Sequence, residues 1–344
     1  MRSAGSKIVM VLMALLLVCT PSAFSQYFGQ NKPAYRPFDF NVLQSPNFEI
    51  YHYLDNDTLL RDFSAWAEEW YKIHQQIFKD TFDRRNPVIL YSNHADFQQT
   101  NAISSSISTG TSGVTEALKN RVVMPVAPTL SQTDHVLGHE LVHAFQFNKI
   151  LRADTSKHYS IQNVPLWMIE GMAEYFSLGS IDPNTAMWMR DALINHDFPT
   201  LKQLSTESKY FPYRYGHAFW ATVGKTWGDT AIMPLFEQTA RLGVEKAIDS
   251  VLGYDMKTLS GMWKSAMTRH FQKYIEDSTD HLVGSKVISQ ENGGRINISP
   301  SLSPDGKYLT FFSEKNVFTI DLFLADAKNG QIIKKLTDQY YKPP

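Results

Sequence analysis

Residues 136–146 read VLGHELVHAFQ, and residues 165–175 read PLWMIEGMAEY. Apolar residues dominate both stretches, so each predicts a largely buried helix. Positions four apart lie on one face of a helix, one turn above the other. His139 and His143 therefore present two imidazole rings side by side, with Glu140 next to them. Such polar groups need partners in a buried helix, because unpaired imidazole and carboxylate groups are costly to bury.

The His-Glu-x-x-His spacing is typical of a zinc site. Catalytic zinc usually takes three protein ligands and leaves a fourth position for water, and Glu170 is the natural third ligand beside His139 and His143. Glu174 follows on the same helix face and could accept a hydrogen bond from the outer nitrogen of a ligating histidine. Zinc lowers the pKa of its water to about 7. Glu140 would then take the proton of that water and deliver it to the leaving amine.

Other interpretations of the polar residues stay open. A His135–His139 pair shares the same helical spacing but has no glutamate beside it, so we interpret His135 as a polar contact at the helix start. Tyr213 and Tyr215 open a later helix. A tyrosine hydroxyl near zinc could stabilise an oxyanion, but the spacing fits two core aromatic residues equally well. His217 is interpreted as structural.

The first 25 residues have the pattern of a signal peptide. Arg2 and Lys7 are basic, residues 8–18 are apolar, and residues 23–25 read AFS, which predicts cleavage after residue 25. The apolar run is too short to span a membrane, so the mature chain is expected to lack a transmembrane segment. Val18 before Cys19 does not favour lipidation. We expect export to a bacterial periplasm, cell surface or medium.

Composition excludes several classes of protein. The 344 residues carry a formal net charge of −1, which gives no electrostatic basis for binding nucleic acid. The single cysteine, Cys19, lies in the predicted signal peptide. The mature chain therefore has no disulfides and no thiolate chemistry, which favours a bacterial envelope over a eukaryotic secretory route.

Hydrophobic patterning predicts an α+β fold. Strands are expected at 48–53, 87–91 and 121–126, and helices at 58–82, 131–148 and 165–178, with a Ser-, Thr- and Gly-rich loop at 101–118. Ser131 or Thr133 is the expected N-cap. Pro125 suits an edge strand, and an open edge at residues 121–126 could bind an extended peptide. Residues 185–275 are mostly helical in pattern, and residues 296–337 give four short strand-like runs.

The two quoted stretches resemble the signature helices of the gluzincin metallopeptidases, most of all the bacterial secreted peptidase-MA-like proteins. The resemblance implies zinc on His139, His143 and Glu170, with Glu140 as base and Glu174 as the outer acceptor. A Tyr-x-x-Gly segment of the aminopeptidase branch maps onto Tyr213 and Gly216, which implies Tyr213 as the oxyanion donor.

This sequence departs from the family pattern in two places. The gap between His143 and Glu170 spans 26 residues, longer than in typical aminopeptidases, so residues 152–164 could reshape the cleft. Residues 113–116 (GVTE) match the exopeptidase element only weakly. The sequence does not distinguish endopeptidase from exopeptidase activity.

Residues 299–307 (SPSLSPDGK), with 320–322 (IDL) and 336–337 (LT), are similar to one blade of a TolB-type β-propeller. The resemblance implies a platform that binds a protein or ligand. The resulting domain division is a signal peptide (1–25), an irregular lead-in (26–45), a zinc-binding peptidase core (46–182), a helical lobe (183–280) and a partial propeller blade (281–344).

The sequence thus predicts an exported zinc metallopeptidase of gluzincin type that acts on peptide or protein substrates. Two alternatives remain at this stage. One is a catalytically silent peptidase-like scaffold whose propeller binds protein or envelope partners. The other is a zinc hydrolase that acts on a bond other than a peptide bond.

Overall fold

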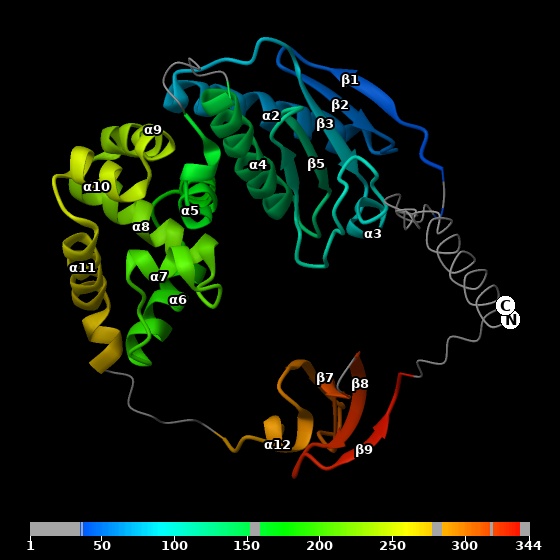
Figure 1. The fold of residues 1–344 in the computed structure, drawn as a ribbon. Coiled ribbons are helices and arrows are strands. Elements are labelled where there is room, and N and C mark those ends of the chain that lie inside the picture. The colour runs from blue at the N-terminus through cyan, green and yellow to red at the C-terminus, as the bar shows by residue number, and fades with distance from the viewer. Residues whose placement is uncertain (1–34, 36, 152–158, 277–283, 317–318, 338–344) are drawn as a thin grey trace, which may run out of the picture. The chain divides into compact units, whose positions relative to one another are not determined.

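The computed structural model describes residue 35 and residues 37–151, 159–276, 284–316 and 319–337 (Figure 1). The predicted signal peptide, Cys19 and most of the loop at 152–164 lie outside these ranges. The chain divides into two compact units, residues 1–275 and 276–344. Across the described ranges, every helix is too short or too polar to cross a membrane.

A five-stranded mixed sheet forms the N-terminal part of the first unit. Its order is β1 (Asn41–Gln44), β2 (Phe48–His52), β3 (Asn86–Tyr91), β5 (Arg121–Pro125) and β4 (Val114–Glu116). Strands β2, β3 and β5 run parallel, while β1 and β4 pair antiparallel at the two edges. Alternate apolar side chains of the central strands are buried in the main core, as the two-residue period of a strand requires.

Two long helices pack on this sheet, α2 (Asp57–Phe78) and α4 (Leu130–Leu151) (Figure 1). The short α3 (His94–Phe97) contributes Phe97 to a separate, smaller core. Helix α4 begins one residue earlier than predicted, because the side chain of Thr129 accepts a hydrogen bond from the Gln132 amide and so takes the capping role. Thr133, one of the two predicted caps, is instead buried in the first turn.

A series of helices completes the described part of the first unit. Its helices are α5 (Leu166–Leu178), α6 (Pro183–Ile194), α7 (Leu201–Thr206), α8 (Pro212–Trp227), α9 (Ile232–Leu242), α10 (Val244–Leu252) and α11 (Met256–Glu276). Helices α5 and α8 cross where Gly171 meets Gly216, and a Cβ on either glycine would collide with the opposite backbone. The backbones therefore approach as closely as only glycine allows.

The second unit is a four-stranded antiparallel sheet preceded by α12 (Gln290–Gly293). Its strands are β6 (Asn297–Leu302), β7 (Tyr308–Asn316), β8 (Thr319–Asp326) and β9 (Ile332–Lys335). One face buries Leu309, Phe311 and Phe323, whereas Ile298 and Phe312 are exposed. The described residues of the second unit form one sheet and no closed propeller.

Three sequence predictions about the first sheet need correction. The irregular lead-in contains β1, and the loop at 101–118 contains β4. Strand β5 is not an edge, because it pairs with β3 on one side and with β4 on the other. Pro125 is tolerated because β4 pairs only with residues 121–123, which leaves the position without a strand partner on that side. The edge beside α4 is β4.

The glycine crossing gives a direct test of how α5 and α8 are held. We expect Gly216→Ala to lower the free energy of unfolding by about 3 kcal/mol, because the new methyl group forces the helices apart. Urea denaturation followed by tryptophan fluorescence measures this effect in the first unit, since all seven tryptophans lie between residues 66 and 263.

Gly261→Ala is the matched control, because a Cβ at this position in α11 meets no atom within 4 Å. This change should stabilise the protein by up to about 1 kcal/mol through helix propensity. Equal effects of the two substitutions would contradict close packing at Gly216.

Candidate metal centre

Helices α4 and α5 bring three side chains to one point. Nε2 of His143 lies 3.2 Å from Nε2 of His139. Oε2 of Glu170 lies 3.3 Å from the Nε2 atom of His139 and 3.2 Å from that of His143. The two histidines are buried, as the apolar flanks of their helix predicted. The three predicted ligands thus form a triangle of nearly equal sides.

This triangle has the dimensions that a zinc ion requires. Ligands placed about 2.0 Å from a tetrahedral ion lie about 3.3 Å from one another. Nδ1 of His143 donates to Oε1 of Gln146 at 2.8 Å, and the Gln146 amide nitrogen donates in turn to the Ile169 carbonyl at 3.1 Å. Because Nδ1 is committed as a donor, Nε2 of His143 presents its lone pair to the centre of the triangle.

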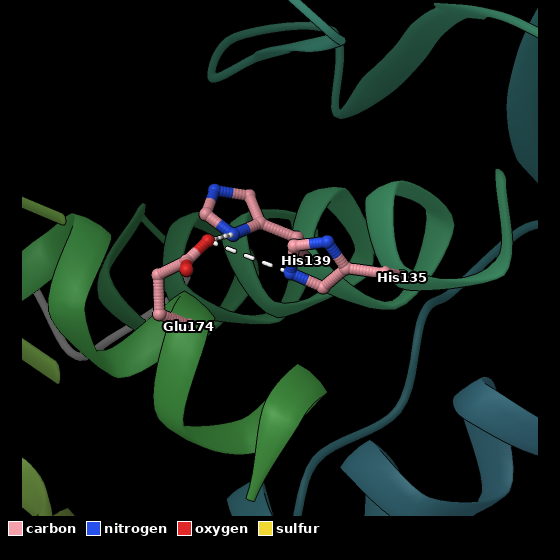
Figure 2. Close-up of side chains that lie close together, drawn as sticks. All are labelled: His135, His139 and Glu174. Carbon is pink, nitrogen blue, oxygen red and sulfur yellow. Dashed lines mark ion pairs between the residues drawn. The ribbon is translucent and has the colours of Figure 1, made fainter. Parts of the chain in front are cut away.

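The outer nitrogen of His139 faces a second carboxylate. Figure 2 shows the rings of His135 and His139 on α4 directed at the carboxylate of Glu174 on α5. Oε1 of Glu174 lies 3.0 Å from Nδ1 of His139 and 3.5 Å from Nε2 of His135, although neither contact is aligned as a hydrogen bond. A carboxylate this close favours a proton on Nδ1, which again leaves Nε2 for the centre.

The charges around the triangle attract a cation. Burial alone lowers the pKa of His139, but the carboxylates of Glu170 and Glu174 outweigh it and raise that pKa to about 10. Burial also lowers the pKa of His143, and Glu170 again raises it overall. The histidines in turn hold the pKa of Glu170 well below its usual range, against the effect of burial. Without a metal, a proton therefore occupies the centre.

His135, His139 and Glu174 form a second cluster with metal-ligand spacing. Its carboxylate already has a cation, because Nη1 of Arg214 donates to Oε2 of Glu174 at 2.7 Å. The same Nη1 contacts Oδ2 of Asp182 at 3.3 Å. Within the described ranges, Glu170 has no Lys or Arg partner. The charge balance therefore favours the triangle on Glu170 over the His135 cluster.

The predicted base, Glu140, is held by the edge strand. The hydroxyl of Thr115 on β4 lies 2.6 Å from Oε2 of Glu140 and 2.9 Å from its backbone carbonyl oxygen. A Cβ on Gly113 would lie 2.7 Å from Oε1 of Glu140, so a larger residue at this position would displace the Glu140 side chain. Sequence reasoning considered residues 113–116 only as a weak exopeptidase element, and it missed Thr115, Gln146 and Arg214. Those partners come together only through tertiary packing.

Tyr213 lies in the first turn of α8 and stacks on His139, with ring centroids 5.8 Å apart. Burial and the carboxylates of Glu170 and Glu140 raise its pKa, so its hydroxyl keeps its proton at neutral pH. Tyr215 is buried among core aromatic rings instead. His217 contacts the Thr185 hydroxyl at 2.9 Å and the Gly179 carbonyl at 2.7 Å. These contacts agree with a structural role for His217.

Comparison with known proteins supports a peptidase-like domain. A family model described as "Peptidase of plants and bacteria" matches residues 96–197, less than a third of the chain. The matched segment contains β4, β5, α4 and α5, and therefore all three corners of the triangle and Glu140. No curated protein matches the chain.

The contribution of the ion pair between Arg214 and Glu174 to stability can be tested by substitution. The side chain of Glu174 is only 4% exposed, so Arg214→Met would remove the guanidinium that pairs with a buried carboxylate. We expect the free energy of unfolding of the chelator-treated protein to fall by about 3 kcal/mol in urea denaturation.

Lys209→Met serves as the control, because Lys209 pairs with Asp197 on the surface and both side chains are about half exposed. Surface pairs contribute only about 0–1 kcal/mol. The role assigned to Arg214 is wrong if its loss costs no more than the loss of Lys209.

Proposed function

We propose that this chain is an exported zinc-dependent peptidase of gluzincin type. The observation that carries the proposal is the triangle of His139 Nε2, His143 Nε2 and Glu170 Oε2, with sides of 3.2–3.3 Å. These atoms are the nitrogen and oxygen donors that zinc prefers, and three protein ligands leave a fourth position open. The peptidase family match over the same segment supports a hydrolytic role.

The side chains around the triangle have complementary roles in this proposal. A bound zinc ion would polarise the scissile carbonyl and lower the pKa of water to about 7. Glu140, oriented by Thr115, accepts a proton from the attacking water and returns it to the leaving amine. The protonated hydroxyl of Tyr213 can donate to the negative charge that develops on the carbonyl oxygen. Glu174 and Gln146 orient the two histidines.

Metal analysis tests the centre itself. We expect about one zinc per chain in the purified protein, and loss of that zinc in His143→Ala. Zinc affinity should rise with pH, because His139, whose pKa without metal is about 10, must lose a proton to bind. Competition with a chromophoric chelator at several pH values measures both effects.

His270→Ala is the control, because His270 is exposed on α11. This variant should keep the zinc content and affinity of the wild type. A wild-type protein that binds no zinc would refute the metal assignment.

Cleavage of a mixed peptide library tests the chemistry. The wild type should cleave, whereas Glu140→Gln should lose at least about a hundredfold in kcat/KM while it keeps its zinc, because the amide cannot accept the proton. The exposed Glu69→Gln on α2 should behave as wild type.

The outcome separates the peptidase from the two alternatives. A zinc-loaded wild type that leaves every peptide intact would favour a binding scaffold or a hydrolase of another bond. The cleavage sites themselves show whether the protein is an endopeptidase or an exopeptidase.

A further inference from the structure

Three aromatic rings continue outward from the metal centre. Tyr213 stacks on His139, and Phe211, the N-cap residue of α8, stacks on Tyr213 with centroids 5.0 Å apart and planes at 28°. Trp188 on α6 follows, with its centroid 5.5 Å from that of Phe211. We call Trp188, Phe211 and Tyr213 the aromatic shelf.

The outer part of the aromatic shelf is open to solvent. Phe211 is 40% exposed and Trp188 is 37% exposed. A single exposed apolar side chain is ordinary, but two large rings that pack against each other at a tilt of 33° and continue to a candidate active site indicate a contact surface. Met187, next to Trp188 in sequence, is also exposed and could adapt to a ligand.

The aromatic shelf is anchored to the main hydrophobic core through Trp188. Trp188 also meets the ring of Tyr215 edge-on, with centroids 6.3 Å apart, and Tyr215 belongs to the main core. Aromatic side chains have few rotatable bonds, so an anchored ring offers apolar area at little entropic cost. The aromatic shelf is thus a preorganised surface and not a flexible loop tip.

The distances match the reach of a bound peptide. Phe211 stands two ring-to-ring steps, of 5.8 and 5.0 Å, from His139. An extended peptide advances about 3.3 Å per residue. A peptide whose scissile bond lies at the metal centre therefore places a side chain over Phe211 within about three residues of that bond.

We propose that the aromatic shelf binds an aromatic or large aliphatic side chain of the peptide substrate and so determines specificity. This inference rests on the proposed peptidase function and names its substrate class. The shelf presents ring faces and edges, which favour offset or edge-to-face contact with another apolar group.

A set of blocked alanine-rich hexapeptides tests the proposal, with one phenylalanine placed at each position in turn and an all-alanine peptide as reference. Binding is measured on the Glu140→Gln protein, which is expected not to cleave, and kcat/KM is measured on the wild type. Phenylalanine at one position, or at two neighbouring positions, should improve both quantities about tenfold over alanine.

The shelf variants connect this preference to its residues. Phe211→Ala and Trp188→Ala should each reduce the preference, taken as the ratio to the all-alanine peptide on the same variant, to about threefold or less. Phe211→Leu should keep part of the preference, because it restores apolar volume. Tyr254→Ala is the control, since Tyr254 is equally exposed, at 37%, but pairs with Trp227 outside the shelf.

The two measurements separate this inference from the proposed function. A phenylalanine preference in binding that disappears in the shelf variants supports the shelf even if the wild type cleaves nothing. Cleavage without any phenylalanine preference, or a preference that survives both alanine substitutions, would overturn it while the peptidase proposal stands.

Discussion

Three electron-pair donors face one another at the centre of this fold. His139, His143 and Glu170 present Nε2, Nε2 and Oε2 within 3.2–3.3 Å of each other, inside a largely apolar helical interface. The lone pairs of these three atoms repel one another unless a cation lies between them. The need for positive charge between these atoms raises the pKa values of both histidines and lowers the pKa of Glu170. A proton satisfies this need in part, and the proposed divalent ion would bind all three donors at once.

The rest of the first unit serves to hold these donors in place. Gln146, itself bonded to the carbonyl of Ile169 between the two helices, holds the outer nitrogen of His143. The glycine pair at 171 and 216 then lets α8 approach α5 closely enough for Tyr213 to reach His139. Strand β4 brings Thr115 to Glu140. Elements far apart in sequence therefore converge on about two turns of α4, from His139 to Gln146.

The sequence predicted the local part of this arrangement well. Helices at 131–148 and 165–178 were recognisable from period and flanks, and the i, i+4 spacing placed His139 beside His143 because helix geometry is local. The sequence did not predict β1 in the irregular lead-in or β4 in the loop at 101–118, because edge strands of three or four residues carry little periodic signal. The roles of Thr115 and Arg214 could not be predicted for another reason, since their partners lie 25 and 40 residues away in the sequence.

Glu170 and Glu174 show most clearly what tertiary structure adds. They lie one turn apart on the same face of α5, so helical geometry allows either to complete a triad with the histidines of α4. Helix α8 distinguishes them. It pairs Arg214 with Glu174, beside Nδ1 of His139, and it places the uncharged Tyr213 near Glu170. Glu170 therefore keeps a negative charge directed at the centre, which is what a metal ligand requires.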